Sequence, residues 1–211
     1  MNIIFIAPPA AGKGTQAKIL CEKYGLFHIS TGDLLRRATK DDLELQKKLS
    51  SGEFIDDSVI LELLRKELNS NQLDVGFVLD GFPRNIEQAI ALENMLQEKP
   101  AVIYIEVSDE LARNRILGRL YCNECGATYN SIIIENKPKV ADICDNCHST
   151  LIKRSDDTEE TFNNRLRFYT EYTKPLLDYY RNQNVLYTVD GNQDTMKVHS
   201  DIVNVLEGEI W

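Results

Sequence analysis

The chain carries the stretch NIIFIAPPAAGKGT at residues 2–15, in which an apolar run leads through two prolines to a glycine and a lysine. The run Asn2–Ile6 has the composition of a buried strand, and residues 13–23 have the pattern of a helix. Successive backbone N–H groups at such a turn, together with the helix N-terminus, form a cradle for an anion. The stretch therefore predicts a phosphate-binding loop between a strand and a helix.

This loop resembles a Walker A motif but departs from it in two places. Ala7 stands at the position of the first glycine, and Gly14 stands at the usual Ser or Thr position, so Thr15 would supply the hydroxyl that holds Mg²⁺. Lys13 would place a point charge on the phosphates. The GKGT ending is typical of nucleoside monophosphate kinases. A proline-rich strand-to-helix turn without a ligand remains the alternative interpretation of this stretch alone.

Four further apolar runs have the length and composition of buried strands. They cover residues 27–30, 77–80, 101–107 and 185–190. Helical patterns separate them at residues 58–68, 85–97 and 158–182, and Asp157 with Glu160 forms a candidate capping box for the last of these helices. This alternation predicts an α/β fold, a P-loop doubly wound parallel five-stranded sheet with helices on both faces.

Composition limits the class of protein. The 211 residues, 43% hydrophobic and 27% charged, suit one sizeable α/β domain with a small insertion. The net charge of −9 counts against a general nucleic-acid or membrane-surface binder, since both surfaces attract positive charge. No apolar run approaches the ~20 residues that cross a bilayer, and the short N-terminal run lacks the basic lead-in of a signal peptide. We therefore expect a cytoplasmic protein.

Four of the five cysteines form two CxxC pairs, Cys122 with Cys125 and Cys144 with Cys147. This spacing is typical of a tetrahedral zinc site, and four thiolates leave no open position, which predicts a structural Zn²⁺. Iron in the same cage stays open, and four unrelated thiols are the alternative. The surrounding subdomain is too small to bury a sufficient core, so a metal cross-link would replace that core.

Short motifs at strand ends and around the cysteines carry a family resemblance. They are GKGTQA (12–17), ISTGDLLR (29–36), DGFPR (80–84) with Gln88, Gly118-Arg119, and RSDD (154–157) with Arg165. In order and spacing they are similar to the adenylate kinase family over essentially the whole chain, in the bacterial long-lid form whose lid can bind zinc.

The resemblance implies a reversible, Mg²⁺-dependent transfer of a phosphoryl group from ATP to AMP, which yields two ADP. It divides the chain into a core domain, a helical AMP-binding arm and a zinc-binding lid. The core comprises residues 1–29, 56–117 and 158–211, the arm residues 30–55, and the lid residues 118–157. ATP, AMP and ADP would be the partners, with no nucleic acid and no membrane, and the protein would be a monomer.

The resemblance also implies three sets of site residues. The catalytic set is Lys13, Asp80, Arg84, Arg119, Arg154 and Arg165. The ATP-binding set is Ala10, Ala11, Gly12, Lys13, Gly14, Thr15, Arg115, Arg119, Thr128, Tyr129 and Gln193. The AMP-binding set is Thr31, Arg36, Glu53, Phe54, Ile55, Gly81, Phe82, Pro83, Arg84, Gln88, Arg154 and Arg165.

Elementary chemistry agrees with these roles. Gln88 offers both a donor and an acceptor to an adenine edge, and guanidinium groups such as Arg36 and Arg84 bind oxyanions bidentately. Asp80, at the end of a strand beside the phosphate loop, can hold the water shell of Mg²⁺. Because the acceptor is already an anionic phosphate, no general base is needed. Taken singly, Thr31 could equally cap a helix and Arg36 could be a solvated surface charge.

Some positions depart from the family or leave alternatives open. Ala10 stands where the family usually has glycine and would cost about 1 kcal/mol if its φ is positive. The AMP arm is also shorter than in typical long-lid members. Arg115 and Arg119 would share one face if their helix runs through Gly118. The alternative functions are a kinase for UMP, CMP or GMP, a zinc-ribbon nucleic-acid-binding ATPase, and a non-catalytic nucleotide sensor.

Overall fold

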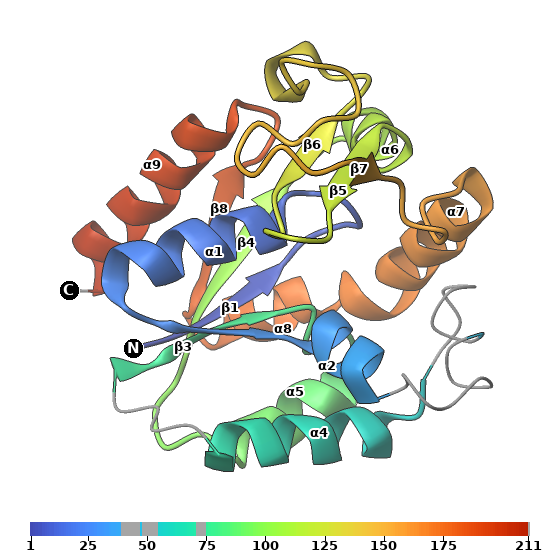
Figure 1. The fold of residues 1–211 in the computed structure, drawn as a ribbon. Coiled ribbons are helices and arrows are strands. Elements are labelled where there is room, and N and C mark those ends of the chain that lie inside the picture. Colours follow the sequence, from blue (N-terminus) through green and yellow to red (C-terminus); the bar gives the residue numbers. More distant parts are fainter. Residues whose placement is uncertain (39–46, 48–54, 71–74, 211) are drawn as a thin grey trace.

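The computed structural model describes residues 1–38, 47, 55–70 and 75–210, and its centre is a five-stranded parallel sheet (Figure 1). The strands lie in the order β2-β3-β1-β4-β8. Their bounds are β1 Asn2–Ile6, β2 Phe27–Ser30, β3 Phe77–Asp80, β4 Ala101–Glu106 and β8 Leu186–Asp190. Each predicted strand is confirmed to within one residue at either end. The three inner strands, β3, β1 and β4, are mostly buried on both faces, as continuous apolar runs of this length predict.

Helices cover both faces of the sheet, as predicted. Side chains alternate along β1, so Ile3 and Phe5 pack against one set of helices while Ile4 and Ile6 pack against the other. The first set is α1 (Lys13–Tyr24), α6 (Asp109–Leu117), α7 (Glu159–Phe168) and α9 (Thr195–Val205). The second set is α2 (Thr31–Ala38), α4 (Asp57–Ser70), α5 (Ile86–Glu93) and α8 (Leu176–Asn182).

Connections from β1 and β3 leave the sheet in opposite directions. The chain runs from β1 through α1 to the edge strand β2, whereas it runs from β3 through α5 to β4 on the other side of β1. In parallel sheets a crevice forms at the carboxyl ends of strands where the winding reverses in this way. Asp80, the last residue of β3, pairs in register with Phe5 of β1 and Ser30 of β2, so it lies beside this crevice.

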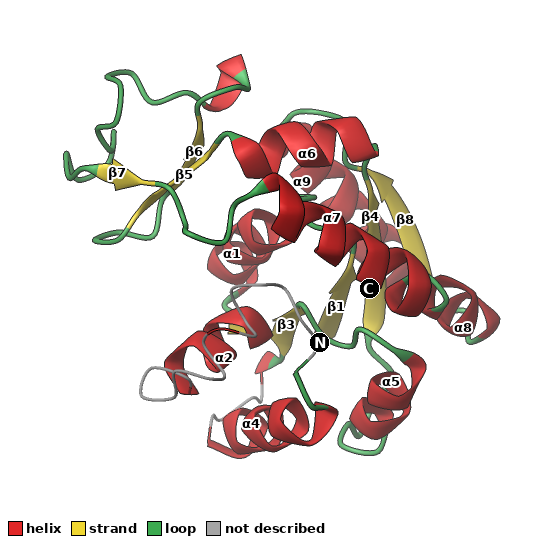
Figure 2. Ribbon diagram, turned by 90° about the vertical axis from the view of Figure 1, so that its right-hand side faces the viewer, coloured by secondary structure: helices red, strands yellow, loops and turns green. Residues whose placement is uncertain are grey.

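The cysteine-rich segment between α6 and α7 forms its own three-stranded antiparallel sheet, of order β6-β5-β7 (Figure 2). Its strands are β5 Arg119–Cys122, β6 Thr128–Asn130 and β7 Leu151–Ile152, with a 3₁₀ turn η2 at Ile134–Asn136. β6 covers three residues, and the chain after it turns into η2. The buried centre is small, formed by Leu120, Cys122, Cys144 and Leu151, which agrees with the expectation that apolar burial alone is insufficient here.

Three expectations around this insert differ from the structure. Helix α6 ends at Leu117 with Gly118 as its C-cap, and Arg119 begins β5, so Arg115 and Arg119 share no helix face. The helix stops there because Ser131 donates its backbone N–H to the Gly118 carbonyl at 2.7 Å and draws the chain into the antiparallel sheet.

The predicted helix at 158–182 is also divided, by a π-helical segment at Tyr169–Thr173 between α7 and α8. Its N-cap is Thr158, whose hydroxyl accepts from Thr161 N at 3.2 Å, and not Asp157. Asp157 does not cap this helix because both of its carboxylate oxygens accept hydrogen bonds from the Arg119 guanidinium. None of the described helices combines the length and the apolar character that a membrane crossing requires.

Ala10 adopts a left-handed backbone conformation in the β1–α1 loop, with φ of 59°. Ala10 therefore has the positive φ at which an alanine is expected to be strained. We expect Ala10→Gly to raise the free energy of unfolding by about 1 kcal/mol, because the left-handed region strains an alanine more than a glycine. Urea denaturation of the ligand-free protein measures this.

The adjacent alanine provides a matched control. Ala11 is 3% exposed and its φ is not positive, so Ala11→Gly should lower the free energy of unfolding by about 1 kcal/mol through lost burial and added chain entropy. Equal effects of the two substitutions would contradict strain at Ala10.

Candidate functional site

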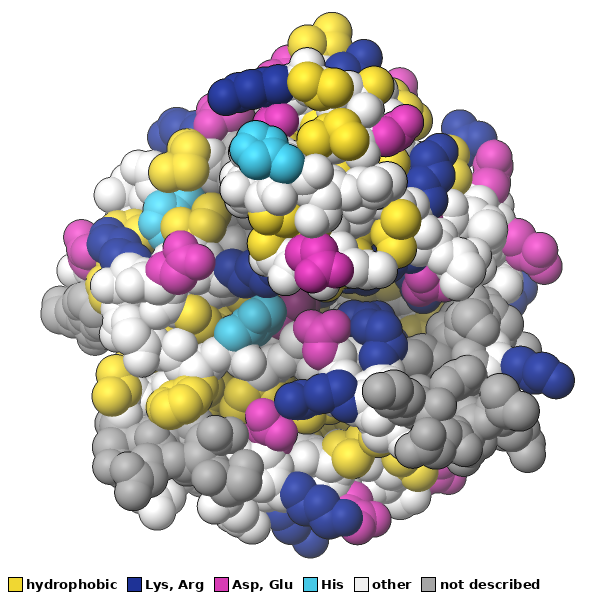
Figure 3. All heavy atoms as spheres, viewed as in Figure 1, with side chains coloured by type: hydrophobic (Ala, Val, Ile, Leu, Met, Phe, Trp, Pro, Cys, Tyr) yellow, Lys and Arg dark blue, Asp and Glu magenta, His cyan; other side chains and the backbone are white. Residues whose placement is uncertain are grey.

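A cavity of about 680 Å³ lies at the carboxyl ends of β1, β2 and β3, below the cysteine-rich insert. Its mouth is surrounded by Lys and Arg side chains with Asp and Glu between them (Figure 3). Most of the predicted site residues line it. These are Ala10, Ala11, Gly12, Lys13, Gly14, Thr15, Arg36, Ile55, Asp80, Gly81, Pro83, Arg84, Gln88, Arg115, Arg119, Thr128, Tyr129, Arg154 and Arg165.

The β1–α1 loop holds Lys13 at the floor of this cavity. The ammonium group donates to the carbonyls of Ala7 and Pro8, both at 3.0 Å. Burial lowers the pKa of Lys13 to about 8; Asp80 opposes this shift, and the cations Arg84 and Arg119 add to it. A bound anion would offset this cost of burying the charge, so the loop is electrostatically suited to phosphate.

Asp80 lies directly beneath the same loop. A Cβ added to Gly14 would approach Asp80 Oδ2 to 3.2 Å, and Thr15, the next residue, also faces the cavity. A carboxylate and a hydroxyl beside a phosphate cradle are ligands that suit Mg²⁺, directly or through water. The arrangement fits the metal position predicted from the sequence.

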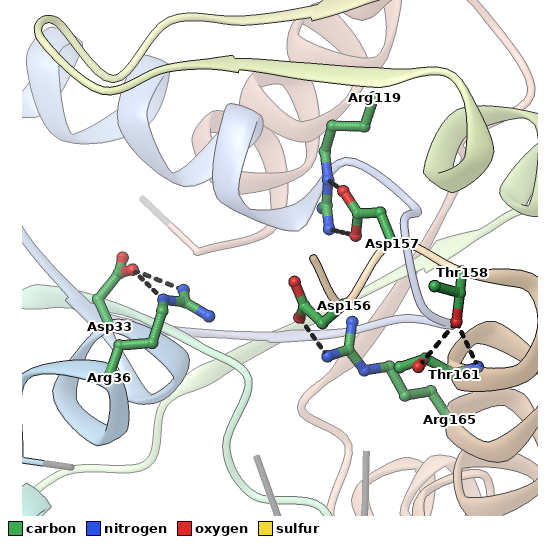
Figure 4. A network of polar contacts seen from close by, with 8 residues as sticks. All are labelled: Asp33, Arg36, Arg119, Asp156, Asp157, Thr158, Thr161 and Arg165. Atoms are coloured by element: carbon green, nitrogen blue, oxygen red, sulfur yellow. Dashed lines mark hydrogen bonds and ion pairs between the residues drawn. The ribbon is translucent and has the colours of Figure 1, made fainter. Parts of the chain in front are cut away.

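Three of the predicted arginines are held by carboxylates of the protein (Figure 4). The pairs are Arg36 with Asp33, Arg119 with Asp157, and Arg165 with Asp156. The Arg165 Nη2 to Asp156 Oδ2 distance is 2.6 Å, and Arg119 uses two nitrogens on the two oxygens of Asp157. These pairs fix the guanidinium groups on the cavity wall.

Two other arginines make no ion pair with a carboxylate in the described part of the chain. Arg84 donates from Nε to the Gly81 carbonyl at 2.8 Å, and the Arg154 guanidinium lies 5.0 Å from the centre of the Tyr121 ring. The pKa of each is lowered, first by removal from bulk water and then by nearby arginines, among them Arg36. Cations that lower one another's pKa in this way favour a ligand with several negative charges.

Arg115 and Gln193 are occupied by the protein itself. Arg115 donates to the carbonyls of Ala11 at 3.3 Å and Gly191 at 3.0 Å, which ties the phosphate loop to the loop after β8. Gln193 donates to the Asp190 carbonyl and to Asp201, both at 3.0 Å, and does not line the cavity. The structure thus shows Arg115 as a brace of the loop, and a nucleotide contact by either residue stays a prediction.

On the other side of Asp80, several predicted residues form a tightly packed wall. Thr31 is buried and donates its hydroxyl to the Asp80 carbonyl at 3.3 Å. A Cβ at Gly81, whose φ is 86°, would lie 2.9 Å from that hydroxyl, so glycine is required there. Phe82 is buried and, like Thr31, lies behind the cavity surface. Glu53 and Phe54 lie outside the described residues.

Sequence reasoning missed His28 and the paired carboxylates. His28 lines the cavity, and its Nε2 lies 3.8 Å from Asp80 Oδ2 without a hydrogen-bond partner among the described residues. Its place two residues before Ser30 in β2 was the available signal, because alternation puts both on one side of the strand. Asp156 was named only as part of a motif and Asp157 also as a helix cap, because their partners Arg165 and Arg119 lie 9 and 38 residues away in the chain.

The four cysteines of the insert lie together. Their Sγ atoms fall within 4.8 Å of one another, with Cys122 to Cys147 at 3.4 Å and Cys125 to Cys144 at 3.5 Å. A tetrahedral ion with bonds of about 2.3 Å requires sulfurs about 3.8 Å apart, so the cluster fits a metal. The Tyr129 hydroxyl lies 3.6 Å from Cys144 Sγ and accepts from Asp145 N at 2.8 Å, so this end of the side chain faces the cysteines.

Comparison with known proteins identifies one family. Its model, described as adenylate kinase, matches residues 5–185. The adenylate kinase of Clostridium tetani is 43% identical over 214 residues, 98% of each chain. That of Archaeoglobus fulgidus is 45% identical over 215 residues, 98% of each chain, and that of Methanosarcina barkeri is 44% identical over 215 residues, 98% of this chain and 99% of the relative. The residues matched by the family model span the segment that carries the four cysteines and most of the residues that line the cavity.

The lowered pKa of Lys13 predicts a pH-dependent stability. Between about pH 8 and pH 10.5 the unfolded chain retains a proton that the folded chain has released, so stability rises with pH through this window. The difference in the free energy of unfolding between the wild type and Lys13→Met should grow by about 1–2 kcal/mol in favour of the wild type from pH 7.5 to pH 10. This is less than the full pKa shift would give, because Lys13 is partly exposed and solvent screens its charge. Urea denaturation of both proteins measures it, and a constant difference would contradict the shift.

Proposed function

The chain belongs to the adenylate kinase family, and from this premise we propose how its residues transfer a phosphoryl group between ATP and AMP to give two ADP. The observation that carries the proposal is the convergence of Lys13, Arg84 and Arg154 on one cavity without an ion pair to any described carboxylate. Two nucleotides that present several phosphates supply the missing negative charge.

On the ATP side, the phosphate loop and Lys13 hold the β- and γ-phosphates. The backbone N–H groups of residues 10–15 form the cradle, and Arg115 braces its shape through the Ala11 carbonyl. Mg²⁺ bound with ATP neutralises phosphate charge, and Thr15 and Asp80 would hold it, Asp80 through water. Arg119, the backbone of Thr128 and Tyr129, and the backbone of Gln193 would contact the rest of ATP.

On the AMP side, arginines hold the phosphate and one amide meets the base. The arginines are Arg36, Arg84, Arg154 and Arg165. Gln88 would meet the adenine, and the wall of Thr31, Ile55, Gly81, Phe82 and Pro83 would shape the base pocket together with Glu53 and Phe54. The support is that Gln88 and Arg84 are adjacent on one cavity wall, bonded through Arg84 N to Gln88 Oε1 at 2.7 Å.

Catalysis follows from position and charge. An oxygen of the AMP phosphate attacks the γ-phosphorus of ATP, the bond to the β,γ-bridging oxygen breaks, and ADP leaves from each side. The attacking oxygen carries no proton, so no base is required. Lys13, Arg84, Arg119, Arg154 and Arg165 offset the repulsion between the two nucleotides and the charge that moves in the transition state. The insert above the cavity would exclude water, which otherwise accepts the phosphoryl group.

The cysteine cluster supports a structural Zn²⁺. We propose residues 118–157 as the lid, residues 30–55 as the AMP arm and the remainder as the core. Four thiolates saturate the ion, so it holds the shape of the lid and takes no part in the chemistry. Reduced thiols as metal ligands favour a cytoplasmic protein, and we propose a monomer, since one chain supplies both sides of the cavity.

The substrate assignment predicts a preference among acceptors. With ATP and Mg²⁺, the purified protein should form ADP with AMP at a kcat/KM at least roughly tenfold above that with UMP, CMP or GMP. A coupled assay for ADP measures each pair. Equal use of UMP or CMP would support the alternative monophosphate kinase, and nucleic-acid binding in a gel-shift assay without turnover would support the zinc-ribbon alternative.

Two arginine variants test the cavity in the same assay. Arg84→Met removes a guanidinium from the phosphate site and should lower kcat roughly 10²- to 10³-fold. Arg113→Met is the matched control, because Arg113 is exposed, pairs with Glu159 and lies outside the cavity lining. Full activity of Arg84→Met would remove this residue from the mechanism.

The metal proposal predicts that zinc and lid stability are lost together. Protein purified without added metal should contain one Zn²⁺ per chain, and Cys144→Ser should lose it and melt several degrees lower, because metal binding contributes to folding. Cys21→Ser, outside the cluster on α1, is the control and should retain the ion. Iron in place of zinc, or unchanged melting of Cys144→Ser, would contradict the proposal.

A further inference from the structure

The side-chain amide of Gln88 is held at both ends. Its Oε1 accepts from the backbone N–H of Arg84 at 2.7 Å, and its Nε2 donates to Asp57 Oδ1 at 2.6 Å. A backbone N–H can only donate and a carboxylate can only accept. The amide has two orientations, which exchange the positions of its oxygen and its nitrogen, and only one of them satisfies both partners. Gln88 is 1% exposed, so its side chain has little room to move to a different position.

Asp57 is itself fixed by a second contact. It is the first residue of α4, and its other oxygen, Oδ2, accepts from Asn85 Nδ2 at 2.9 Å. Asn85 caps α5 and accepts from Gln88 N at 2.7 Å. The three side chains form a closed network between α4 and α5, in which the plane of the carboxylate is set by one bond to each amide.

The orientation of Gln88 determines what it offers to the cavity. Each end of the amide retains one further bond: a second lone pair on Oε1 and a second hydrogen on Nε2. The Watson–Crick edge of adenine presents a donor at N6 and an acceptor at N1, which complements this pair. The 6-oxopurines present an acceptor at O6 and a donor at N1, and they would require the flipped amide.

We propose that Asp57 sets the purine specificity of the site, by holding the Gln88 amide in the orientation that matches adenine and rejects 6-oxopurines. The proposal rests on the proposed function, in which Gln88 meets the base of AMP. Asp57 is a positioning residue, since it acts on the base only through Gln88. Nothing else in the network requires a carboxylate at this position, because a single acceptor would suffice to tie α4 to α5.

Asp57→Asn tests the proposal with AMP and IMP as acceptors. IMP differs from AMP only at the edge in question, so it isolates the orientation of the amide. An asparagine has one acceptor oxygen for two amide donors, so Asn85 or Gln88 loses its partner and the Gln88 amide can turn. We expect the ratio of kcat/KM for AMP to that for IMP to fall roughly tenfold or more, with the KM for ATP unchanged.

Asp56→Asn is the matched control. It removes the same charge one residue earlier, and Asp56 bonds to Ser58 at the start of α4 without contacting Gln88. The AMP-to-IMP ratio of this variant should equal that of the wild type. A fall in both variants would assign the effect to charge or to the start of α4 and would overturn the inference.

The outcomes separate the inference from the function beneath it. A wild-type enzyme that uses AMP and IMP equally well would refute the assignment of Gln88 to adenine. A wild-type preference that survives in Asp57→Asn, with activity on both acceptors reduced alike, would show that the network is only a tie between helices. If circular dichroism shows Asp57→Asn unfolded, Asp57→Ser is measured by the same ratio, since its shorter side chain reaches neither amide.

Discussion

Mutual repulsion among cations is the constraint that the rest of this structure accommodates. Lys13 and arginines from α2, β5, α7 and two loops approach one cavity closely enough that several lower the pKa of a neighbour. Part of this charge is offset by the carboxylates of Asp33, Asp156 and Asp157, but Arg84 and Arg154 have no such partner among the described carboxylates. The chain carries a net charge of −9 and still concentrates positive charge here. Such a site is most stable when it holds polyanions.

The fold brings these cations together in two ways. The parallel sheet places the ends of β1, β2 and β3 side by side, so that the phosphate loop, α2 and Asp80 share one edge without long loops. The cysteine-rich insert adds Arg119 at its start and Arg154 near its end, and β5 and β7 pair between them. Because this insert has only a small apolar core, a metal ion held by the four cysteines would help this strand pairing to keep the two arginines at a fixed separation.

Features set by neighbours in sequence were predictable, and features set by distant partners were not. The five strands followed from runs of buried residues, and the cysteine cluster followed from CxxC spacing, because both patterns depend on short-range chemistry. Asp157 was wrongly predicted to cap a helix because its actual partner, Arg119, lies 38 residues away in the chain. The end of α6 at Gly118 likewise depends on Ser131 across the insert. The partners of Gln88 could not be predicted for the same reason, since Asp57 lies in a different helix.

The local motifs and the distant contacts also differ in what they can determine, since the motifs bear on affinity for phosphate and the distant contacts bear on specificity for the base. Guanidinium and ammonium groups bind phosphates of any nucleotide, so the conspicuous motifs of the sequence cannot by themselves choose a base. In the proposed function base choice falls to the Gln88 amide. An amide carries a donor and an acceptor of nearly the same shape, so it discriminates between bases only as far as its orientation is fixed. In this chain the orientation of the Gln88 amide is fixed by the backbone N–H of Arg84 and by the carboxylate of Asp57, which lies in another helix. On this proposal specificity depends on how α4 and α5 pack, and it would change while every phosphate-binding motif stays intact.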